Sequence, residues 1–501
     1  MKKIYYITAV FATLFLVGCG DGIDLPGVNV ETDLNKIPLP DNNVNLEQVE
    51  LKPSTEPMLH EGLHTEEDFQ RIRDKKAAGE EPWVSAYQLL VESQFSQKTA
   101  DTYPTEWIKR GVSGDENYMN AARGATIAYQ QALRWKIEQD DEYAAKAVEN
   151  LNKWVQTCVG VTGNTNLSLA AGLYGYEFAI AGELLRDYGG WDRADFAAFQ
   201  NWLLKVFYPA NDDFLKRHHD TNALHYWANW CLCNIAAKMA IGIVTDRRDI
   251  YNEGIAHLQT GDTNGRLRRA IYHDYAPDYN FAQWQESGRD QAHTMLAIGC
   301  LSEMAEVAWK QGIDLYAAYD NRIMKGMEYL SKYNLGYDVP FKTWTDKTGR
   351  YNNWITLGES SRGEFRSVFE LAYNHYVYRR HLQMPYTDKV LGLIRPEWQG
   401  FKCDNPGFGT LLFYLGKGVE KAVPGKVNEF PMQAWKGWKT PSLSWRANQG
   451  EYEFCVPSLS MSKSLDYAAG EYPLIAVKVS KMPKKRNKNW FRLCYSVNSA
   501  P

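Results

Sequence analysis

Three segments of the chain combine histidine, arginine, asparagine and tyrosine in patterns that can support acid–base chemistry. The first is "DTNALHYWANWCLCN", in which Asn222, His225 and Asn229 are three and four residues apart. If a helix begins near Thr221, this spacing places them in one polar stripe beside an apolar face. Such a stripe serves either a buried hydrogen-bond network that braces neighbouring helices or a binding site. Spacing alone favours neither interpretation.

The second segment is "YNFAQWQESGRDQAHTMLAIGCL". Its charged and polar side chains gather just before, or in the first turns of, an apolar helix: Glu286, Arg289, Asp290 and His293. Two tyrosines, Tyr275 and Tyr279, lie just upstream. A structural interpretation is that Ser287 or Asp290 caps the helix while Arg289 pairs with a carboxylate. Tyrosine, arginine and histidine together at one helix start also fit a catalytic site.

The third segment, "GESSRGEFRSVFELAYNHYVYRR", alternates polar residues with aromatic ones: Arg362, Arg366, Asn374 and His375. The sequence contains no nucleotide-binding glycine loop, no nucleophile elbow and no zinc motif of the HExxH type. These residue types therefore favour a reaction that uses neither a metal nor a cofactor.

β-Elimination in a polymer of uronic acids is one such reaction. The proton at C5 is weakly acidic, and the neighbouring carboxylate must first be neutralised by donors such as asparagine, arginine or histidine. A base then takes the proton and an acid delivers one to the departing O4. A tyrosine hydroxyl or a histidine imidazole can do either if its pKa is tuned.

The overall composition limits the class of partner. Lys and Arg number 56 against 60 Asp and Glu, so the chain lacks the basic excess of a general nucleic-acid binder. The 17 Trp and 31 Tyr residues suit the flat faces of sugar rings, but they also fill helical cores, which composition alone favours. A polyanionic ligand would need locally placed positive charges.

The N-terminus has the layout of an export signal. "MKKIYYITAVFATLFLVGCG" has two lysines, an apolar run too short for an ordinary membrane span, and then Cys19. It resembles a bacterial lipoprotein signal, in which residues 1–18 are removed and Cys19 carries the lipid. We therefore expect an exported protein, anchored in the cell envelope, in the periplasm or on the outer-membrane surface. Its contact with the membrane would be through that lipid alone.

The elements that must position these side chains are mostly helical. Residues 19–57, rich in Asp, Asn and Pro, are typical of a tether. From 58 to 420, apolar residues recur at helical spacing, as in 143–154, 169–184 and 232–243. Polar turns separate these segments, so the expected fold is mainly α: an incomplete α/α toroid of antiparallel helix hairpins.

The last residues, 421–501, differ in character from the helical region. The segments "YEFCVPSLSMSKS", "YPLIAVKVS" and "NWFRLCYSV" are short and rich in β-branched and aromatic residues. They predict a small or truncated C-terminal β region.

Several of these segments together resemble the alginate lyase domain family, one of the α/α-toroid polysaccharide lyases, and in particular its lipoprotein members from Bacteroidetes. The matching stretches, spread over most of residues 60–415, include "HYWANWCLCNIAAKMAIGI", "QESGRDQAHTMLAIGCLSEMAEVAWKQGIDLY" and "FELAYNHYVYRRHLQMPYT". The resemblance implies a helical toroid with an open groove and lyase activity on alginate, particularly its mannuronate blocks, or on glucuronan. The expected partner is thus an anionic uronate polysaccharide, with no cofactor.

The resemblance also assigns roles to residues. The better-known alginate lyases carry Asn-Asn-His-x-Tyr-Trp, whereas here the histidine, His225, is displaced by one position. A tyrosine follows further along in those lyases, and Tyr279 fits that separation best, with Tyr275 next. The resemblance implies His225 and Tyr279 as the acid/base pair, with Asn229 and Arg289 neutralising the carboxylate. His293 either orients these groups or replaces the tyrosine. The side chains expected to contact the substrate are Asn222, Asn166, Trp230, Tyr275, Arg362 and His375.

Two other functions stay open at this point. A glycoside hydrolase on a helical toroid would need two carboxylates across its cleft, and Glu286, Asp290 and Glu359 form no compelling pair. A non-catalytic, surface glycan-binding lipoprotein would keep the aromatic residues and the anchor but would tolerate loss of the tyrosine and histidine set.

Overall fold

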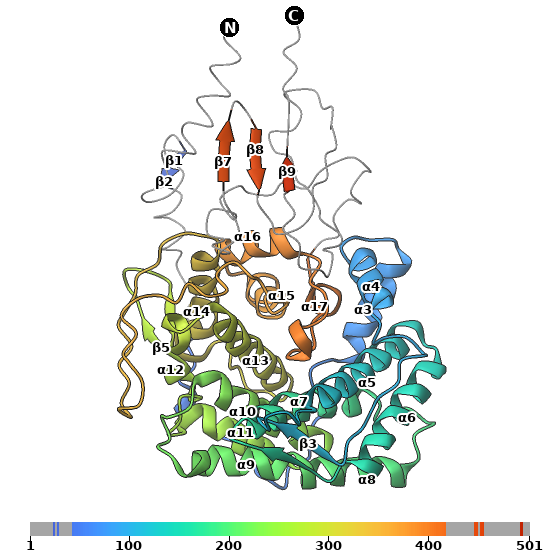
Figure 1. Cartoon of the computed structure of the whole chain (residues 1–501). Helices are drawn as coiled ribbons and strands as arrows, with labels where there is room; N and C mark the ends of the chain where they lie inside the picture. The colour runs from blue at the N-terminus through green and yellow to red at the C-terminus, as the bar shows by residue number, and fades with distance from the viewer. Residues whose placement is uncertain are drawn as a thin grey trace, which may run out of the picture.

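The structure, a computed structural model, describes residues 43–416 and, outside them, the backbone of five short strands. Within this region the chain is mostly helical. An inner ring of helices packs side by side in chain order, and its last member contacts the first helices of the chain. Figure 1 shows this ring, with the colours passing from blue through green to orange around it. The inner helices are α5 (Tyr118–Glu138), α7 (Leu167–Leu184), α10 (Ala228–Val244), α13 (Gln291–Lys310), α15 (Glu370–Asn374) and α17 (Gly409–Phe413).

The remaining helices either cover the inner ring from outside or join its members. The longer ones are α3 (Glu66–Ala77), α4 (Trp83–Glu92), α6 (Asp141–Thr157), α8 (Arg193–Val206), α9 (Tyr208–Arg217), α11 (Arg248–Thr260), α14 (Ala318–Asn334) and α16 (Pro385–Ile394). The short ones are η1 (Leu46–Gln48), η2 (His218–Asp220), α12 (Leu267–Ala270), η3 (Gln285–Gly288), the π-helical turn η4 (His375–Arg379) and η5 (Phe401–Cys403). The expected mainly α toroid is confirmed.

The inner helices lie close together because their sequences are rich in small and apolar residues. α7 and α10 bury nearly every side chain they carry. At Gly172 in α7, an added Cβ would lie 2.6 Å from the sulfur of Cys233 in α10, so only glycine permits this approach. Both residues lie in the second turn of their helices, and Arg186, just after α7, contacts the last residues of α10, so the two helices run parallel. Their N-terminal ends thus face the same side of the ring.

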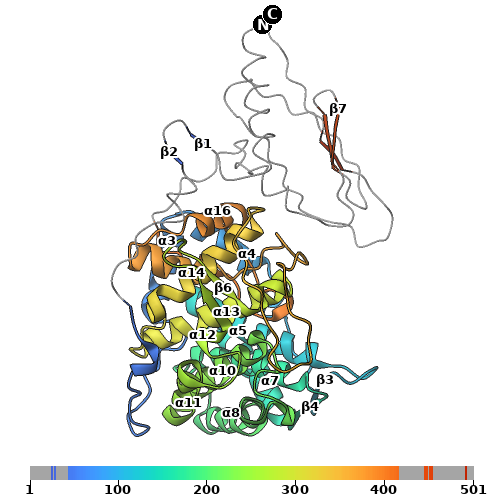
Figure 2. The same ribbon diagram turned by 90° about the vertical axis from the view of Figure 1, so that its left-hand side faces the viewer.

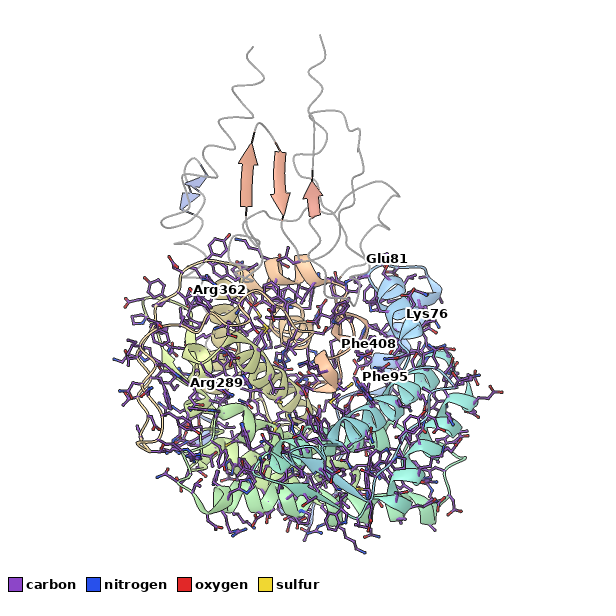
Figure 3. All side chains as sticks on the ribbon, in the orientation of Figure 1. Lys76, Glu81, Phe95, Arg289, Arg362 and Phe408 are labelled. Atoms are coloured by element: carbon purple, nitrogen blue, oxygen red, sulfur yellow. The ribbon has the colours of Figure 1, made fainter. Side chains whose placement is uncertain are left out.

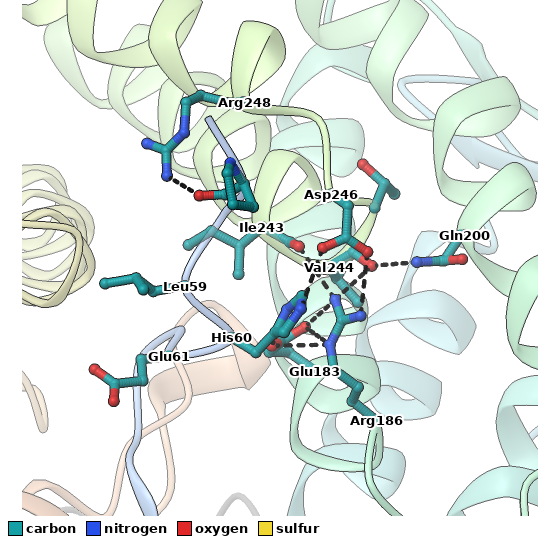
Figure 4. Close-up of polar contacts among 12 residues, drawn as sticks. Leu59, His60, Glu61, Glu183, Arg186, Gln200, Ile243, Val244, Asp246 and Arg248 are labelled. Atoms are coloured by element: carbon teal, nitrogen blue, oxygen red, sulfur yellow. Dashed lines mark hydrogen bonds and ion pairs between the residues drawn. The ribbon is translucent and has the colours of Figure 1, made fainter. Parts of the chain in front are cut away.

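The opposite ends of these helices are held by an ion-pair cluster (Figure 4). Arg186 donates to the carbonyl oxygens of Ile243 and Val244, at 3.2 and 2.9 Å, and to the carboxylate of Glu183 at 2.8 Å. A cation at the last carbonyls of α10 suits the negative end of the helix. His60 lies 3.8 Å from Glu183 and so joins the N-terminal segment to the ring. These contacts fix the C-terminal ends of α7 and α10 relative to each other.

The strands form small, separate sheets. β3 (Trp107–Arg110) pairs in parallel with β4 (Gly160–Gly163), and Figure 2 shows both at one side of the helical ring. β5 (Ile271–Asp274) and β6 (Ala282–Trp284) form an antiparallel pair before α13. Outside residues 43–416, β1 (Asp24–Leu25) pairs with β2 (Val28–Asn29), and β7 (Trp445–Asn448), β8 (Glu451–Phe454) and β9 (Phe491–Leu493) form one antiparallel sheet. β8 and β9 fall in two of the three segments predicted as strands.

Part of the predicted tether is packed against the helices. Leu46 is fully buried, and its carbonyl oxygen accepts a hydrogen bond from Gln259 of α11 at 2.9 Å. Val44 forms a parallel backbone bridge with Ala318, the first residue of α14. Residues 43–57 therefore belong to the folded body, in contrast to the expectation of a tether up to residue 57. Cys19, the signal segment 1–18 and most of 421–501 lie outside the described residues. In the part of the chain that is described, no helix has the length and apolar character needed to span a bilayer.

Candidate active site

His225 lies in a turn that precedes α10, and not on the helix itself. The Asn222 side-chain oxygen accepts the backbone N–H of Leu224 at 2.9 Å, and the Asn222 carbonyl accepts that of His225 at 2.8 Å. Asparagine favours such turns over a helix because its side chain competes for backbone donors. α10 begins only at Ala228. The prediction of a helix from Thr221 is therefore wrong, and the expected polar stripe does not form: Asn222 is exposed in the turn.

The link between α14 and α15 covers this turn. Residues 338–363, here named the strap, lack helical structure, and Trp344 and Trp354 pair through two backbone hydrogen bonds of 3.0 Å. One end of the strap is fixed near α13, where Gly358 donates to the Ser287 carbonyl at 2.9 Å. At Gly288 an added Cβ would lie 2.5 Å from the Cβ of Trp354, so the strap passes directly over this glycine. The strap is thus tied to the start of α13.

His225 is buried beneath the strap. Its Nε2 accepts a hydrogen bond from Arg350 of the strap at 2.5 Å, and its ring stacks on that of Tyr351 with centroids 5.5 Å apart. Burial lowers the pKa of His225, and the charge of Arg350 lowers it further, while Asp346 opposes the shift. His225 is therefore held neutral, with its Nε2 lone pair facing the guanidinium.

Asn229 and Arg289 converge on a carboxylate of the chain itself. Glu286, only 1% exposed, accepts from the Asn229 backbone at 3.0 Å, from its side-chain amide at 2.6 Å and from Arg289 at 2.7 Å. These bonds join the first turn of α10 to the segment before α13. Both residues were expected to neutralise a substrate carboxylate, but in this structure their donors neutralise Glu286. The other amide atom of Asn229, Oδ1, is buried without a hydrogen-bond partner.

His293 forms a dyad with Asp290 at the start of α13. Asp290 caps the helix by accepting the backbone N–H of His293 at 2.8 Å, and its second oxygen lies 2.7 Å from Nδ1 of the same residue. Burial raises the pKa of Asp290, but the hydrogen bonds from His293 and the charges of His293 and Arg289 outweigh it, so this pKa lies below its ordinary value. Nε2 of His293 faces Arg289 at 3.2 Å, and the side chain is 41% exposed. The dyad is accessible to a ligand.

The ring of Trp227 contacts both a neighbour of His225 and a neighbour of His293. The guanidinium of Arg289 lies over its ring at 5.5 Å, and the ring of Tyr351 packs on it at 4.3 Å. Trp344 and Trp354 of the strap complete this aromatic cluster, with centroids 5.5 and 4.8 Å from Trp227. The structure thus brings His225, Arg289 and His293 into one continuous set of contacts at the N-terminal ends of α10 and α13.

Tyr279 and Tyr275 occupy a different set of contacts, in the turn between β5 and β6. Tyr279 is 37% exposed and packs on Phe281 at 6.2 Å. Tyr275 donates its hydroxyl to Gln283 at 2.5 Å and stacks on Tyr329, and burial raises its pKa to about 12. Within residues 43–416, no hydrogen bond or ring contact joins either tyrosine to the two imidazoles. In this structure His225 and Tyr279, the expected acid/base pair, lie in two separate sets of contacts.

Asn166 lies at the start of α7, on the same side of the ring as the imidazoles. Its side-chain amide donates to Asn164 at 2.8 Å, and it is half-buried. Trp230, in the first turn of α10, packs on Tyr226 and Phe214 at 4.9 and 6.0 Å. Asn166 is therefore partly accessible, whereas Trp230 packs against the core.

Arg362 and His375 serve packing in this structure. Arg362 donates to the Tyr333 carbonyl at 2.8 Å and lies over the Tyr333 ring at 3.9 Å, which fixes the strap to α14. Figure 3 labels Arg362 and Arg289 among the side chains of the helical ring. His375 is 1% exposed and stacks on Tyr316 at 3.7 Å, and burial lowers its pKa to about 2. We assign both to structural roles in place of the substrate contacts expected from sequence.

Arg350 and Tyr351 are site residues that sequence reasoning missed. They lie in "TDKTGRYNNW", a polar stretch with a glycine and no helical or strand periodicity, which is typical of a surface loop. Nothing local in the sequence connects it to His225, 125 residues earlier. Metal ligation was not expected, and among the described residues no group of three or more His, Cys, Asp or Glu side chains could hold a metal ion.

Comparison with known proteins agrees with the resemblance seen in the sequence. The family model for alginate lyase matches residues 73–339. No curated protein matches the chain. Alginate lyase A1-III from Sphingomonas species A1 superposes with a TM-score of 0.50 at 13% identity, covering 72% of this chain and 98% of that enzyme. An alginate lyase from Bacteroides ovatus gives 0.47 at 12% identity, covering 71% and 99%. The likeness to the Sphingomonas enzyme shows a shared fold.

Proposed function

Since the chain belongs to the alginate lyase family and is a polysaccharide lyase, we propose that it cleaves a uronic-acid polymer by β-elimination. Alginate, particularly polymannuronate, and glucuronan are the substrates we consider. The Sphingomonas A1-III lyase, in a variant form, has been seen complexed with a tetrasaccharide, and an oligosaccharide is what this site should hold. The product carries an unsaturated uronate at its new non-reducing end.

The reaction requires a base near C5 and an acid near O4. The base takes the C5 proton, the electrons of that C–H bond form the C4=C5 double bond, and the C4–O4 bond breaks. O4 leaves with its bonding electrons and takes a proton from the acid.

His225 and His293 fit these two roles. The hydrogen bonds that hold the two imidazoles are the observation that carries the proposal. His225 is held neutral by burial and by Arg350, which suits a proton acceptor. His293 is oriented by Asp290 at its Nδ1, and it acts as the acid through Nε2 after that nitrogen, which accepts from Arg289 at 3.2 Å in this structure, has taken up a proton. His293 thus takes the place of the tyrosine that the better-known alginate lyases use.

The buried state of Glu286 counts against a glycoside hydrolase. A hydrolase needs two carboxyl groups facing the scissile bond, and the Glu286 carboxylate already accepts three hydrogen bonds inside the protein. Asp290 is likewise engaged by His293. Neither carboxylate is free to activate water or to protonate a leaving group.

The test is ultraviolet absorbance during separate incubations with alginate, polymannuronate and glucuronan. Elimination conjugates the new double bond with the carboxylate and raises the absorbance, whereas hydrolysis does not. A rise with one polymer would support the reaction and name the substrate. New reducing ends without a rise in absorbance would refute it.

A further inference from the structure

Arg350 differs from Arg289 in its charge partners. Arg289 is ion-paired with Glu286 at 2.7 Å. No ion pair within residues 43–416 includes Arg350, although it lies in the same cluster. Its guanidinium donates to Nε2 of His225 at 2.5 Å and lies 5.8 Å from the ring centroid of Tyr351. The site therefore contains a guanidinium that makes no direct ion pair, although the Asp346 carboxylate lies nearby and accepts the Arg350 backbone N–H.

The tip of the strap holds the backbone of Arg350 in place. The Asp346 carboxylate accepts the backbone N–H groups of Thr348, Arg350 and Tyr351 at 3.0, 2.7 and 2.8 Å. These bonds use the carboxylate to shape the turn and leave the guanidinium of Arg350 directed at His225. The backbone is held, while the long side chain keeps its own rotational freedom.

The contact with Arg350 blocks the chemistry proposed for His225. An arginine is always a donor, so His225 must accept with the Nε2 lone pair. That lone pair is the one that would take a proton from the sugar. In the arrangement observed, the base is neutral but occupied, and it becomes available only when Arg350 moves to another acceptor.

The substrate brings such an acceptor to the right place. In a uronate the carboxylate is bonded to C5, the carbon that loses its proton. A base positioned for the C5 proton therefore lies beside the group that binds the carboxylate. Arg350, within hydrogen-bond distance of His225, meets this requirement, and arginine binds a carboxylate through two parallel hydrogen bonds.

We propose that Arg350 is the residue that recognises the uronate carboxylate and that, by moving onto it, uncovers His225. This inference rests on the proposed function. One side chain then does two things: it neutralises the charge next to C5 and frees the base. A neutral sugar offers no carboxylate to draw Arg350 away, so the site would select uronates at the step that exposes its base.

The test compares Arg350→Gln with Lys347→Gln, a matched loss of one positive charge on the same strap at an exposed residue. On the polymer that the wild type cleaves, Arg350→Gln should lower kcat/KM roughly 10²- to 10³-fold, as loss of one preorganised donor does. Lys347→Gln should behave as wild type. Equal activity of the two variants would overturn the proposal. Arg350→Lys, which keeps the charge, should recover part of the loss.

A binding experiment separates this proposal from the proposed function, because it needs no turnover. Calorimetry in a His293→Asn background would compare an oligomannuronate with its carboxyl-reduced counterpart. Arg350→Gln should weaken binding of the uronate roughly 10- to 100-fold, the worth of a charge-assisted hydrogen bond, and leave the neutral oligomer unchanged. Equal losses for both ligands would contradict carboxylate recognition. If no polymer gave an unsaturated product, the proposed reaction would fail while this measurement still decided the role of Arg350.

The pH profile gives a readout that a merely structural residue would not move. The groups that face His225 are Arg350, Asp346 and Tyr351 from the strap, and His218 and Tyr226 from the segment before α10. Removing the Arg350 charge raises the pKa of His225 toward its ordinary value, because one of the two lowering influences is gone. The acid limb of kcat/KM should therefore shift to higher pH in Arg350→Gln and not in Lys347→Gln. An unshifted limb would show that Arg350 does not act on the base.

Discussion

At the scale of single residues, the predicted effect of His293 on catalysis is the easiest to separate from an effect on folding. Its side chain is 41% exposed, and its contacts are with Asp290 and Arg289 alone among the hydrogen bonds described. A substitution here should change chemistry without opening a cavity in the core.

We expect His293→Asn to lower kcat roughly 10²- to 10⁴-fold, the usual contribution of a positioned acid or base. Initial rates of unsaturated product formation give the result, with circular dichroism as the check on folding. His381→Asn, a matched change at an exposed histidine in the left-handed region that asparagine tolerates, is the control. A folded His293→Asn variant with wild-type rates would remove this residue from the mechanism.

At the scale of elements, the strap is held to the start of α13 by close packing at Gly288. An added Cβ would lie 2.5 Å from the Trp354 Cβ and 3.0 Å from the Thr356 carbonyl oxygen. The strap carries Arg350, so its position over α13 decides where that side chain meets His225.

Gly288→Ala should therefore displace the strap and reduce activity by about 10²-fold, since a misplacement of 1 Å can cost that much. Limited proteolysis should cut the strap faster in the variant, while thermal unfolding changes less. Gly392→Ala in α16, where an added Cβ meets nothing within 4 Å, is the control. Unchanged cleavage and unchanged activity in Gly288→Ala would mean that the strap does not depend on this contact.

The helices also show which parts of the fold could be predicted from the sequence. Apolar spacing predicted the helices that became α6, α7 and α10, because burial against neighbours enforces a helical period. The start of α10 was predicted too early, because Asn222 forms a local turn that spacing does not reveal. The pairing of Asn229 with Glu286 and of His225 with Arg350 depends on packing between distant segments, so residue types alone could not supply it.

At the scale of the whole molecule, buried carboxyl groups lie inside the ring. Glu303 of α13 is buried beside Tyr176 of α7 and accepts a hydrogen bond from Asn405 at 3.1 Å. Burial raises the pKa of Glu303 to about 8 from its ordinary value of 4.5. The folded state therefore holds this proton more tightly than the unfolded chain does.

It follows that the stabilisation from this proton is complete below 4.5 and is lost as the pH rises through about 8. Glu303→Gln mimics the protonated group and cannot ionise, so its free energy of unfolding should fall less over that interval than the wild type's. Thermal unfolding at several pH values would show this. Glu306→Gln, which breaks an ion pair of 2.8 Å with Arg379, should instead destabilise at every pH in the interval. Parallel pH dependences for Glu303→Gln and the wild type would refute the assignment.

The most direct measurement of the central claim is the mass and ultraviolet spectrum of the products formed from alginate, polymannuronate and glucuronan. A lyase with the imidazole pair described here should give, from at least one of them, oligosaccharides that absorb in the ultraviolet and are lighter by one water molecule than hydrolysis products of the same length. Cleaved oligosaccharides of the heavier, non-absorbing kind would contradict β-elimination and require a different mechanism at this site.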